Sequence, residues 1–408
     1  MKIGIFKLKE HGSEENGKAR GIGFWGNIAA ICLVPPTGGK WRGLSKFSAG
    51  ENLRQQKPIP ERLNSKSMEM KIIDKSNMRQ IILDFPKQFR IGIEAAKNVH
   101  LEQGDLLWSP ENIIICGMGG SGLPGDILVT LRPLDVFVYK SYRLPLQARN
   151  ESLIICVSYS GNTEETISAF ETAIGRNLPV ISITTGGKLA ELSKKYKTPL
   201  VKLPAPYIPP RLALAQMFGA LIQVLNNNNL LDKKIIDETL KLANILKPGK
   251  IELAGKKLAK KIFKKIPVIY TSRRFRELGT IWKNSLNETA KIVAFTNYFP
   301  ELNHNETVGF EKINEDQVPS KKVYVMILRD KESSYSRILK QMDITKDLIE
   351  KEGVDVDFIE ISGKTFLEKI FSTIILAFWT SYWLALEYKI DPTPIKTVEE
   401  FKKRLKEI

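Results

Sequence analysis

Short apolar runs alternate with amphipathic stretches through the middle of the chain. The first set of apolar runs covers residues 112–116, 136–139, 153–157, 180–184 and 200–203. Stretches with helical spacing fill the gaps and both flanks, at 72–100, 122–131, 163–176, 189–196 and 211–225. Near-continuous apolar strands that alternate with helices are typical of a parallel sheet covered on both faces. The pattern therefore predicts a first α/β domain.

A second set of the same kind begins after the polar run of asparagines at 226–229. Its strand-like runs cover residues 268–270, 292–295, 323–328 and 354–359. Helical stretches are predicted at 232–246, 251–264, 275–290, 335–351, 365–388 and 398–408. We predict two tandem α/β domains, at 68–228 and 229–408, each a parallel sheet between two layers of helices.

Residues 1–67 show no sustained period and contain several Gly and Pro residues. This composition predicts a poorly ordered N-terminal extension. Because Met68, Met70 and Met78 could each start a chain, the sequence leaves open whether the extension is translated.

Two apolar stretches raise the question of a membrane or an export signal. The stretch from Gly21 to Pro36 is broken by Gly, Asn and Pro, which disfavours a secretory signal. The run from Ile370 to Leu386 contains Ser, Thr, Tyr and Trp, which favours a buried helix over a membrane span. We therefore predict a cytoplasmic protein without a membrane partner.

The formal net charge of +17 is spread along the chain, and no basic run is interleaved with aromatic residues. This distribution argues against a nucleic-acid partner, whereas the positive field favours small anionic substrates. The three Cys and three His residues have no disulfide or zinc spacing. The sequence therefore predicts chemistry without a metal or another cofactor.

A glycine-rich turn, ICGMGGSGLPGD, covers Ile115 to Asp126 and joins a predicted strand to a predicted helix. Gly119 and Gly120 allow backbone amides to approach a ligand, Ser121 adds a hydroxyl, and the helix N-terminus favours an anion. The turn lacks the Gly-Lys-Ser/Thr ending of a Walker loop. Alone it is also compatible with a tight turn that binds nothing.

A second polar turn, VSYSGNTEET, follows the third predicted strand at Val157 to Thr166. Its hydroxyls, on Ser158, Ser160 and Thr163, can donate to phosphate oxygens from several directions. In an open parallel sheet both turns lie at the carboxyl ends of the strands, where ligands bind. Together they predict a phosphate-binding cradle.

The two turns together, GMGGSG and then SYSGNTEET, resemble those of the SIS (sugar isomerase) domain. The two-domain layout from about residue 70 to 408 is similar to that of the bifunctional phosphoglucose/phosphomannose isomerases within the SIS superfamily. In the second domain WKNSLNETAKIVAF and YFPELNHNETVGFE resemble the family's catalytic segments. The resemblance implies that Glu288 is the base that moves a proton between C1 and C2, and that His304 assists ring opening. It also implies a homodimer in which His304 reaches the partner's active site.

Two further residues are assigned by the same resemblance. Arg211, in PPRLALAQMFGAL, matches an arginine that can stabilise the charge of an enediolate. The C-terminal segment DPTPIKTVEEFK resembles the closing motif whose lysine takes part in ring opening. Alignment places that lysine at Lys402, although Lys396 and Lys403 stay open.

The resemblance thus implies reversible isomerisation of glucose 6-phosphate, and also of mannose 6-phosphate, to fructose 6-phosphate through a cis-enediol. A carboxylate that takes and returns a carbon-bound proton, and a histidine that titrates near neutral pH, suit this reaction. Two alternatives stay open: another SIS-domain phosphosugar isomerase, and a sugar-phosphate-binding regulator without catalysis. The sequence does not decide the ratio of the glucose to the mannose activity.

Overall fold

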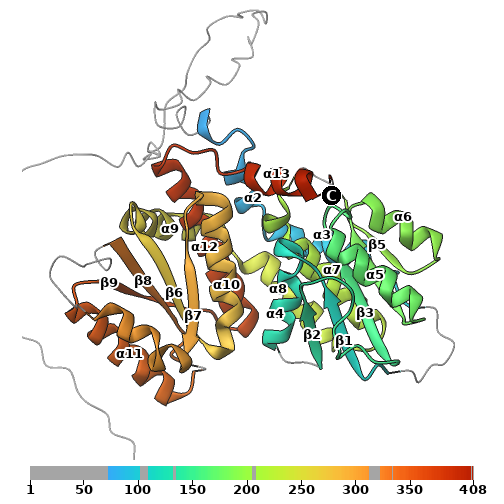
Figure 1. Cartoon of the computed structure of the whole chain (residues 1–408), viewed down its shortest axis with the longest axis horizontal. Coiled ribbons are helices and arrows are strands. Elements are labelled where there is room, and N and C mark those ends of the chain that lie inside the picture. Colours follow the sequence, from blue (N-terminus) through green and yellow to red (C-terminus); the bar gives the residue numbers. More distant parts are fainter. Residues whose placement is uncertain are drawn as a thin grey trace, which may run out of the picture. The chain divides into compact units, whose positions relative to one another are not determined.

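The computed structural model of the chain describes residues 72–101, 109–131, 135–204, 208–311, 322–332, 334–405 and 407 (Figure 1). These residues belong to one compact unit, Arg62–Ile408. The predicted extension at 1–67 lies outside the described residues.

A first parallel sheet has the strand order β2-β1-β3-β4-β5. Its strands are β1 (Asn112–Cys116), β2 (Val136–Tyr139), β3 (Ser152–Val157), β4 (Val180–Thr184) and β5 (Leu200–Lys202). Neighbouring strands run parallel throughout, with Ile114 opposite Ile154 and Ile154 opposite Val180. The predicted strands are confirmed here to within one residue.

Helices cover both faces of the first sheet (Figure 1). They are α4 (Leu123–Leu131), α5 (Glu164–Gly175), α6 (Gly187–Lys195) and α7 (Leu214–Asn227). Side chains alternate along each strand, so Ile114 and Ile154 pack toward α5 and α6 on one face. On the other face Ile113, Ile115 and Ile155 pack into the core that contains α4 and α7. Burial on both faces explains why these strands are apolar at nearly every position.

A second parallel sheet has the order β7-β6-β8-β9, with strands β6 (Ile266–Ser272), β7 (Phe295–Phe299), β8 (Val323–Arg329) and β9 (Asp355–Glu360). The helices of this half are α8 (Lys233–Ile245), α9 (Pro248–Ile262), α10 (Arg276–Ser285), α11 (Ser336–Lys351), α12 (Phe366–Glu387) and α13 (Lys396–Leu405). Met342 and Ile349 of α11 pack on one face of the sheet. The other face joins the core formed by α9, α10 and α12. Each sheet therefore lies between two layers of helices, as predicted.

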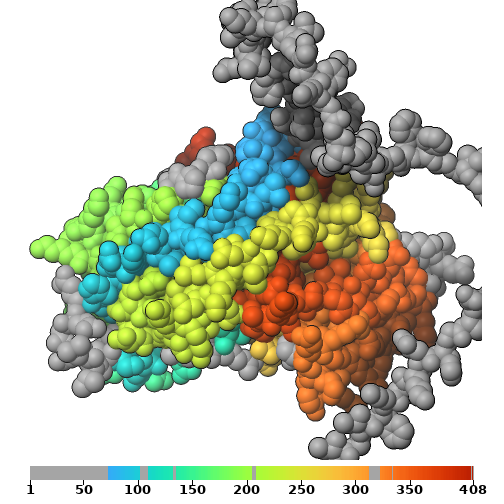
Figure 2. Space-filling model, turned by 180° about the vertical axis from the view of Figure 1, so that it is seen from behind, coloured from blue at the N-terminus to red at the C-terminus, as the bar shows by residue number. Residues whose placement is uncertain are grey.

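The two sheets share one hydrophobic core. Helix α3 (Lys87–Ala96) packs along α7, and Figure 2 shows residues 72–100 in blue lying alongside the yellow-green helices. A Cβ at Gly92 of α3 would lie 1.9 Å from the Gln216 carbonyl oxygen, so only glycine allows this approach. The Phe89 and Phe371 rings meet edge to face at 4.7 Å, which connects α3 to α12.

Two predicted elements differ from the structure. The helix predicted at 72–100 is split into α2 (Met78–Leu83) and α3, because Pro86 lacks an amide hydrogen and stands at the start of α3. The strand predicted at 292–295 begins only at Phe295 and ends at Phe299. Ile292 is still held by the preceding turn, since its carbonyl accepts from Asn287 Nδ2 at 2.8 Å.

Helix α12 contains the apolar run that the sequence left between a buried helix and a membrane span. Among the described residues it is the one helix long and apolar enough to cross a membrane, by length and composition only. In this fold 78% of its apolar window is buried inside the protein. Its apolar character is therefore explained by the core that it occupies.

Candidate active site

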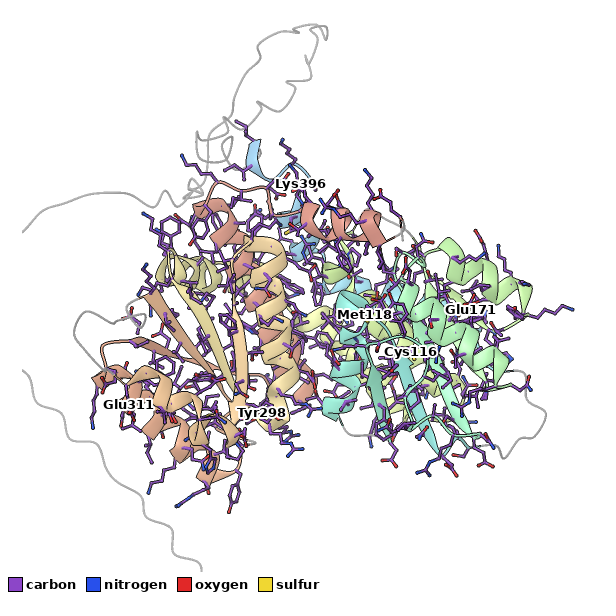
Figure 3. All side chains as sticks on the ribbon, in the orientation of Figure 1. Cys116, Met118, Glu171, Tyr298, Glu311 and Lys396 are labelled. Carbon is purple, nitrogen blue, oxygen red and sulfur yellow. The ribbon has the colours of Figure 1, made fainter. Side chains whose placement is uncertain are left out.

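The first glycine-rich turn becomes a short 3₁₀ helix, η1 (Gly119–Ser121), between β1 and α4. In Figure 3, Cys116 and Met118 mark the place where β1 ends and this turn begins. Gly119 has a left-handed φ of 50°, which favours glycine. A Cβ at Gly120 would lie 2.8 Å from the backbone nitrogen of Arg211. The absence of a side chain at Gly120 lets the turn pack against the backbone that carries Arg211.

The second polar turn joins β3 to α5 and lies at the same edge of the first sheet. Gly161 has φ of 72°, and a Cβ there would come 1.7 Å from the Gly186 carbonyl oxygen. Helix α5 starts at Glu164, and the side chain of its N-cap residue Thr163 makes no capping hydrogen bond. The Thr163 hydroxyl is therefore not used by the helix itself.

Backbone amides of the second turn orient the serine hydroxyls of both turns. Tyr159 N–H donates to Ser121 Oγ at 3.0 Å, Gly161 N–H to Ser158 Oγ at 3.1 Å, and Asn162 N–H to Ser160 Oγ at 3.3 Å. Ser158, which is fully buried, in turn donates to Thr163 Oγ1 at 3.0 Å. A hydroxyl whose oxygen accepts such a bond keeps its own proton for another acceptor. The arrangement thus presents Ser121, Ser160 and Thr163 as donors to an anion, with Ser158 supporting them.

Arg211 connects this cradle to the second half of the chain. It lies in η2 (Pro210–Leu212) and is 5% exposed. Its Nε donates to Thr289 Oγ1 at 3.1 Å, and its Nη2 donates to the carbonyls of Pro392 and Thr393 at 2.8 and 3.0 Å. Nη1 lies 3.7 Å from Glu288 Oε2. The guanidinium is therefore fixed by three neutral oxygens and still faces one carboxylate.

Glu288 lies in a π-helical turn, Leu286–Ala290, that follows α10. Single π turns inside helices are frequent at functional sites. Burial raises the pKa of the Glu288 carboxyl above its ordinary value, while Arg211, Lys291 and Lys402 oppose that rise. A carboxylate whose pKa lies nearer to neutral is a stronger base toward a carbon-bound proton.

Beside Glu288 lies a cavity of about 660 Å³ whose described lining includes Lys291, Asp391, Lys396 and Val398. Of the three C-terminal lysines, Lys396 lines this cavity, whereas Lys402 acts on the Glu288 carboxyl through its charge. All three belong to α13, none of whose described residues is buried. These observations favour Lys396 and Lys402 over Lys403 as the candidate lysine of the C-terminal motif.

His304 is exposed and lies at the other end of the second sheet from Glu288. Strand β7 is parallel to β6 and separates the two residues, since Glu288 precedes it and His304 follows it in η5 (Glu301–His304). Five strand residues span roughly 15 Å at about 3.3 Å per residue. Figure 3 shows Tyr298, near the end of β7, far from Lys396 at the cavity. Within one chain the structure does not bring His304 to Glu288.

Lys291 is a residue that the sequence did not single out, although it lies in the segment that contains Glu288. Its ammonium donates to the carbonyls of Glu288 and Thr289 and, at 3.1 Å, to that of Pro392. It also has a left-handed φ of 58°. A lysine at a position that favours glycine or asparagine can be recognised only once the turn is known.

Within the described residues, no group of three or more His, Cys, Asp or Glu side chains could hold a metal ion. The charged groups around Glu288 are mostly cations, namely Arg211, Lys291 and the more distant Lys402, although Asp391 lines the same cavity. Such groups suit a negatively charged ligand rather than a cation.

Comparisons with known proteins identify the class of the second half first. A family model described as the bacterial phospho-glucose isomerase C-terminal SIS domain matches residues 252–405. The fold is also similar to that of the C-terminal domain of glucosamine-fructose-6-phosphate aminotransferase from Francisella tularensis, with a TM-score of 0.59 and 15% identity. That match covers 78% of this chain and 98% of the other and supports the fold alone.

Two curated relatives define the family more closely. A bifunctional phosphoglucose/phosphomannose isomerase from Caldicellulosiruptor bescii is 34% identical over 351 residues, which is 81% of this chain and 99% of the relative. A protein of the same name from Aquifex aeolicus is 34% identical over 303 residues, 72% of this chain and 91% of that protein. The chain belongs to the bifunctional phosphoglucose/phosphomannose isomerase family of SIS-domain proteins.

Proposed function

We propose that this chain interconverts glucose 6-phosphate, and also mannose 6-phosphate, with fructose 6-phosphate. The observation that carries the proposal is the Glu288 carboxylate, which lies 3.7 Å from a buried Arg211 whose backbone contacts the glycine-rich turn. Arg211 thus contacts both the proposed general base, Glu288, and the proposed anion-binding turn. The names of the curated relatives supply the substrates.

In this mechanism the cradle holds the substrate phosphate through the hydroxyls of Ser121, Ser160 and Thr163 and through the amides near Gly119 and Gly120. These groups donate hydrogen bonds without adding a cation, so the phosphate is anchored at the end of the substrate remote from the reaction. The carbonyl end of the open sugar then lies toward Arg211 and Glu288.

Glu288 takes the proton from C2 of the open-chain aldose, and the electron pair of that C–H bond forms the C1–C2 double bond. The carbonyl oxygen gains the negative charge, which Arg211 stabilises in the enediolate. A proton then passes from the O2 hydroxyl to O1, which leaves the negative charge on O2. The O2 electron pair forms the C2 carbonyl while the electron pair of the C1–C2 double bond takes the proton back from Glu288 at C1, and this gives the ketose. Atoms and electrons balance without an external oxidant or a cofactor.

Both aldoses give the same enediol once C2 has lost its proton, so one site can accept glucose and mannose phosphates. The site needs only to tolerate either configuration at C2 during ring opening. We assign ring opening to His304 of a partner subunit together with Lys402. The position of His304, beyond β7 and exposed, supports a role in a second copy of the chain.

The domain boundaries at 68–228 and 229–408 remain part of this proposal.

This proposal includes a homodimer in the cytoplasm, acting in carbohydrate metabolism at the step shared by glycolysis and gluconeogenesis. Another SIS-domain phosphosugar isomerase or a non-catalytic sugar-phosphate regulator would share the cradle. A regulator has no use for a partly buried carboxylate beside a fixed guanidinium, because removing a charge from water costs free energy that binding alone does not require.

The test is a coupled assay of purified full-length protein on both aldose phosphates, with and without EDTA, beside Glu288→Gln. We expect turnover of both sugars, no change in EDTA, and a fall of kcat by about 10²–10⁴-fold in Glu288→Gln, the usual cost of removing a general base. KM should change little, because the phosphate cradle is intact. Absence of turnover of either sugar, or a Gln variant with the wild-type rate, would overturn the proposed reaction.

A further inference from the structure

Lys291 ends the π turn of Glu288 in a conformation that a lysine rarely adopts. Its φ of 58° and ψ of 34° are left-handed, and its backbone N–H donates to the Leu286 carbonyl. A residue other than Gly, Asn or Asp in this region costs free energy, on the order of 1 kcal/mol. Lys197, Lys264 and Lys389 have similar left-handed φ values, so the backbone alone gives Lys291 no special role.

The side chain of Lys291 makes specific contacts. Although Lys291 is an exposed residue, its ammonium turns back onto the protein and donates to the carbonyls of Glu288, Thr289 and Pro392. Two of these carbonyls belong to the turn itself, and a lysine that only capped a helix end would stop there. The Pro392 carbonyl belongs to the C-terminal segment, 101 residues further along the chain.

Arg211 binds the same C-terminal carbonyl from the other side. Its Nη2 donates to Pro392 and Thr393, while its Nη1 faces Glu288 at 3.7 Å. The segment that leads into α13 is thus held by two cations, and the same two cations flank the Glu288 carboxylate. Displacing one of them would move both the segment and the base.

We propose that Lys291 is a positioning residue for the isomerisation: its ammonium ties the turn of Glu288 to the C-terminal segment at Pro392. The inference rests on the proposed function, which it deepens. In this role Lys291 acts through the turn of Glu288 rather than on the reacting atoms. It fixes the distance between the general base and the segment that brings α13, with Lys402, toward the site.

The charge of Lys291 also sets the working pH of this link. Partial burial of the ammonium lowers the pKa of Lys291 to about 8, and Arg211 adds to that effect, while Asp391 and Glu288 oppose it. Lys75 and Lys396 line the adjoining cavity and add positive charge. Because the ammonium loses its proton as the pH rises through about 8, the link should weaken on the alkaline side.

The test uses the full-length protein with Lys291→Gly, Lys291→Arg and a matched control at Lys197. Lys197 is an exposed lysine with nearly the same φ, 54°, in the turn between α6 and β5. Glycine suits the left-handed backbone at both positions, so each Gly variant removes only the side chain. Lys291→Arg retains a cation that does not titrate below pH 12.

We expect Lys291→Gly to lower kcat by roughly ten- to a hundredfold, the cost of charge-assisted hydrogen bonds, with little change in KM. Lys197→Gly should keep the wild-type kcat. Lys291→Arg should recover most of kcat at pH 7 and shift the alkaline fall near pH 8 upward. A wild-type pH profile and kcat in Lys291→Gly would overturn the proposal, and so would an equal loss in Lys197→Gly.

Hydrogen exchange separates this inference from the proposed function. The amides of Thr393 and of residues 395–398 should exchange faster in Lys291→Gly than in the wild type and in Lys197→Gly. That result would support the link even if neither aldose phosphate were converted, in which case only the proposed reaction would fail. Unchanged exchange in an active enzyme would overturn the link and leave the reaction intact.

Discussion

The two parallel sheets have the same architecture, but the cradle of the first and the Glu288 turn of the second lie at opposite edges. In the first sheet the functional groups follow the carboxyl ends of β1 and β3, where Gly119, Gly120 and Ser160 lie. In the second sheet Glu288 lies before β7, at the amino edge. The same fold therefore places the proposed phosphate cradle at the carboxyl edge in one half and the proposed general base at the amino edge in the other.

The carboxyl edge of the second sheet shows why it holds no equivalent cradle. After β6 the turn contains Arg273, Arg274 and Phe275 instead of glycines, and the Arg274 guanidinium lies 4.2 Å over the Phe366 ring. After β8, the Lys369 ammonium lies 3.0 Å from a carboxylate oxygen of the buried Asp330. Side chains fill the place that open backbone amides occupy in the first sheet. Loops, rather than the sheet itself, decide which edge binds a ligand.

The largest effect should come from removing the imidazole of His304, which follows β7 at the carboxyl edge of the second sheet. We expect His304→Ala to lower kcat by about 10²–10⁴-fold, because ring opening loses its proton donor and acceptor. The measurement is the coupled assay on the cyclic aldose phosphates, together with thermal unfolding, which should be unchanged since His304 is exposed.

Mixing variants tests whether His304 acts in a partner. Unfolded and refolded equimolar mixtures of His304→Ala with Glu288→Gln should regain about a quarter of the wild-type activity. Half of the dimers would contain one chain of each variant, and each of these mixed dimers would have one intact site out of two. Neither variant alone should gain activity after the same treatment. No recovery in a mixture that forms dimers would show that His304 works within its own chain.

The sequence was sufficient for the elements that depend on local pattern. The apolar runs at 112–116 and 180–184 match β1 and β4 residue for residue, because a strand buried on both faces is apolar throughout. The two polar turns could be placed at one edge from strand order alone. Their motifs and the family resemblance then sufficed to name Ser121 and Glu288 as candidates.

What the sequence did not show depends on tertiary contacts. The strand predicted at 292–295 began too early because the apolar Ile292 is held by the π turn, whose five-residue bonding leaves no pattern in the sequence. The role of Arg211 in binding Pro392 and the reach of Lys291 to the same carbonyl join positions far apart along the chain. No spacing rule predicts such contacts.

A smaller effect should follow from separating the cradle from Arg211. In Gly120→Ala the new Cβ would lie 2.8 Å from both the Arg211 nitrogen and the Pro210 carbonyl carbon, and backbone atoms must shift to accommodate it. We expect kcat/KM to fall by about a hundredfold, the cost of misplacing a catalytic group by about 1 Å.

The control is Gly175→Ala at the end of α5, where a Cβ would meet nothing within 4 Å. Its kinetics should be those of the wild type. Normal kcat/KM in Gly120→Ala would mean that catalysis does not depend on the contact between the cradle and Arg211. The proposed roles of the two sheets would then lose the main contact that connects them.

The smallest effects should distinguish the groups within the cradle. Ser160 is exposed and its hydroxyl accepts only a long bond from Asn162 N–H, so Ser160→Ala should raise KM by about tenfold at unchanged stability. Ser158 is fully buried between Gly161 N–H and Thr163, so Ser158→Ala should raise KM and also lower the free energy of unfolding by about 1–3 kcal/mol. Substrate titrations and denaturant unfolding of the two variants measure both quantities. Equal stability of the two variants would mean that Ser158 contacts the phosphate directly instead of orienting Thr163. The buried Ser158 hydroxyl would then be one of the phosphate-binding groups of the first sheet.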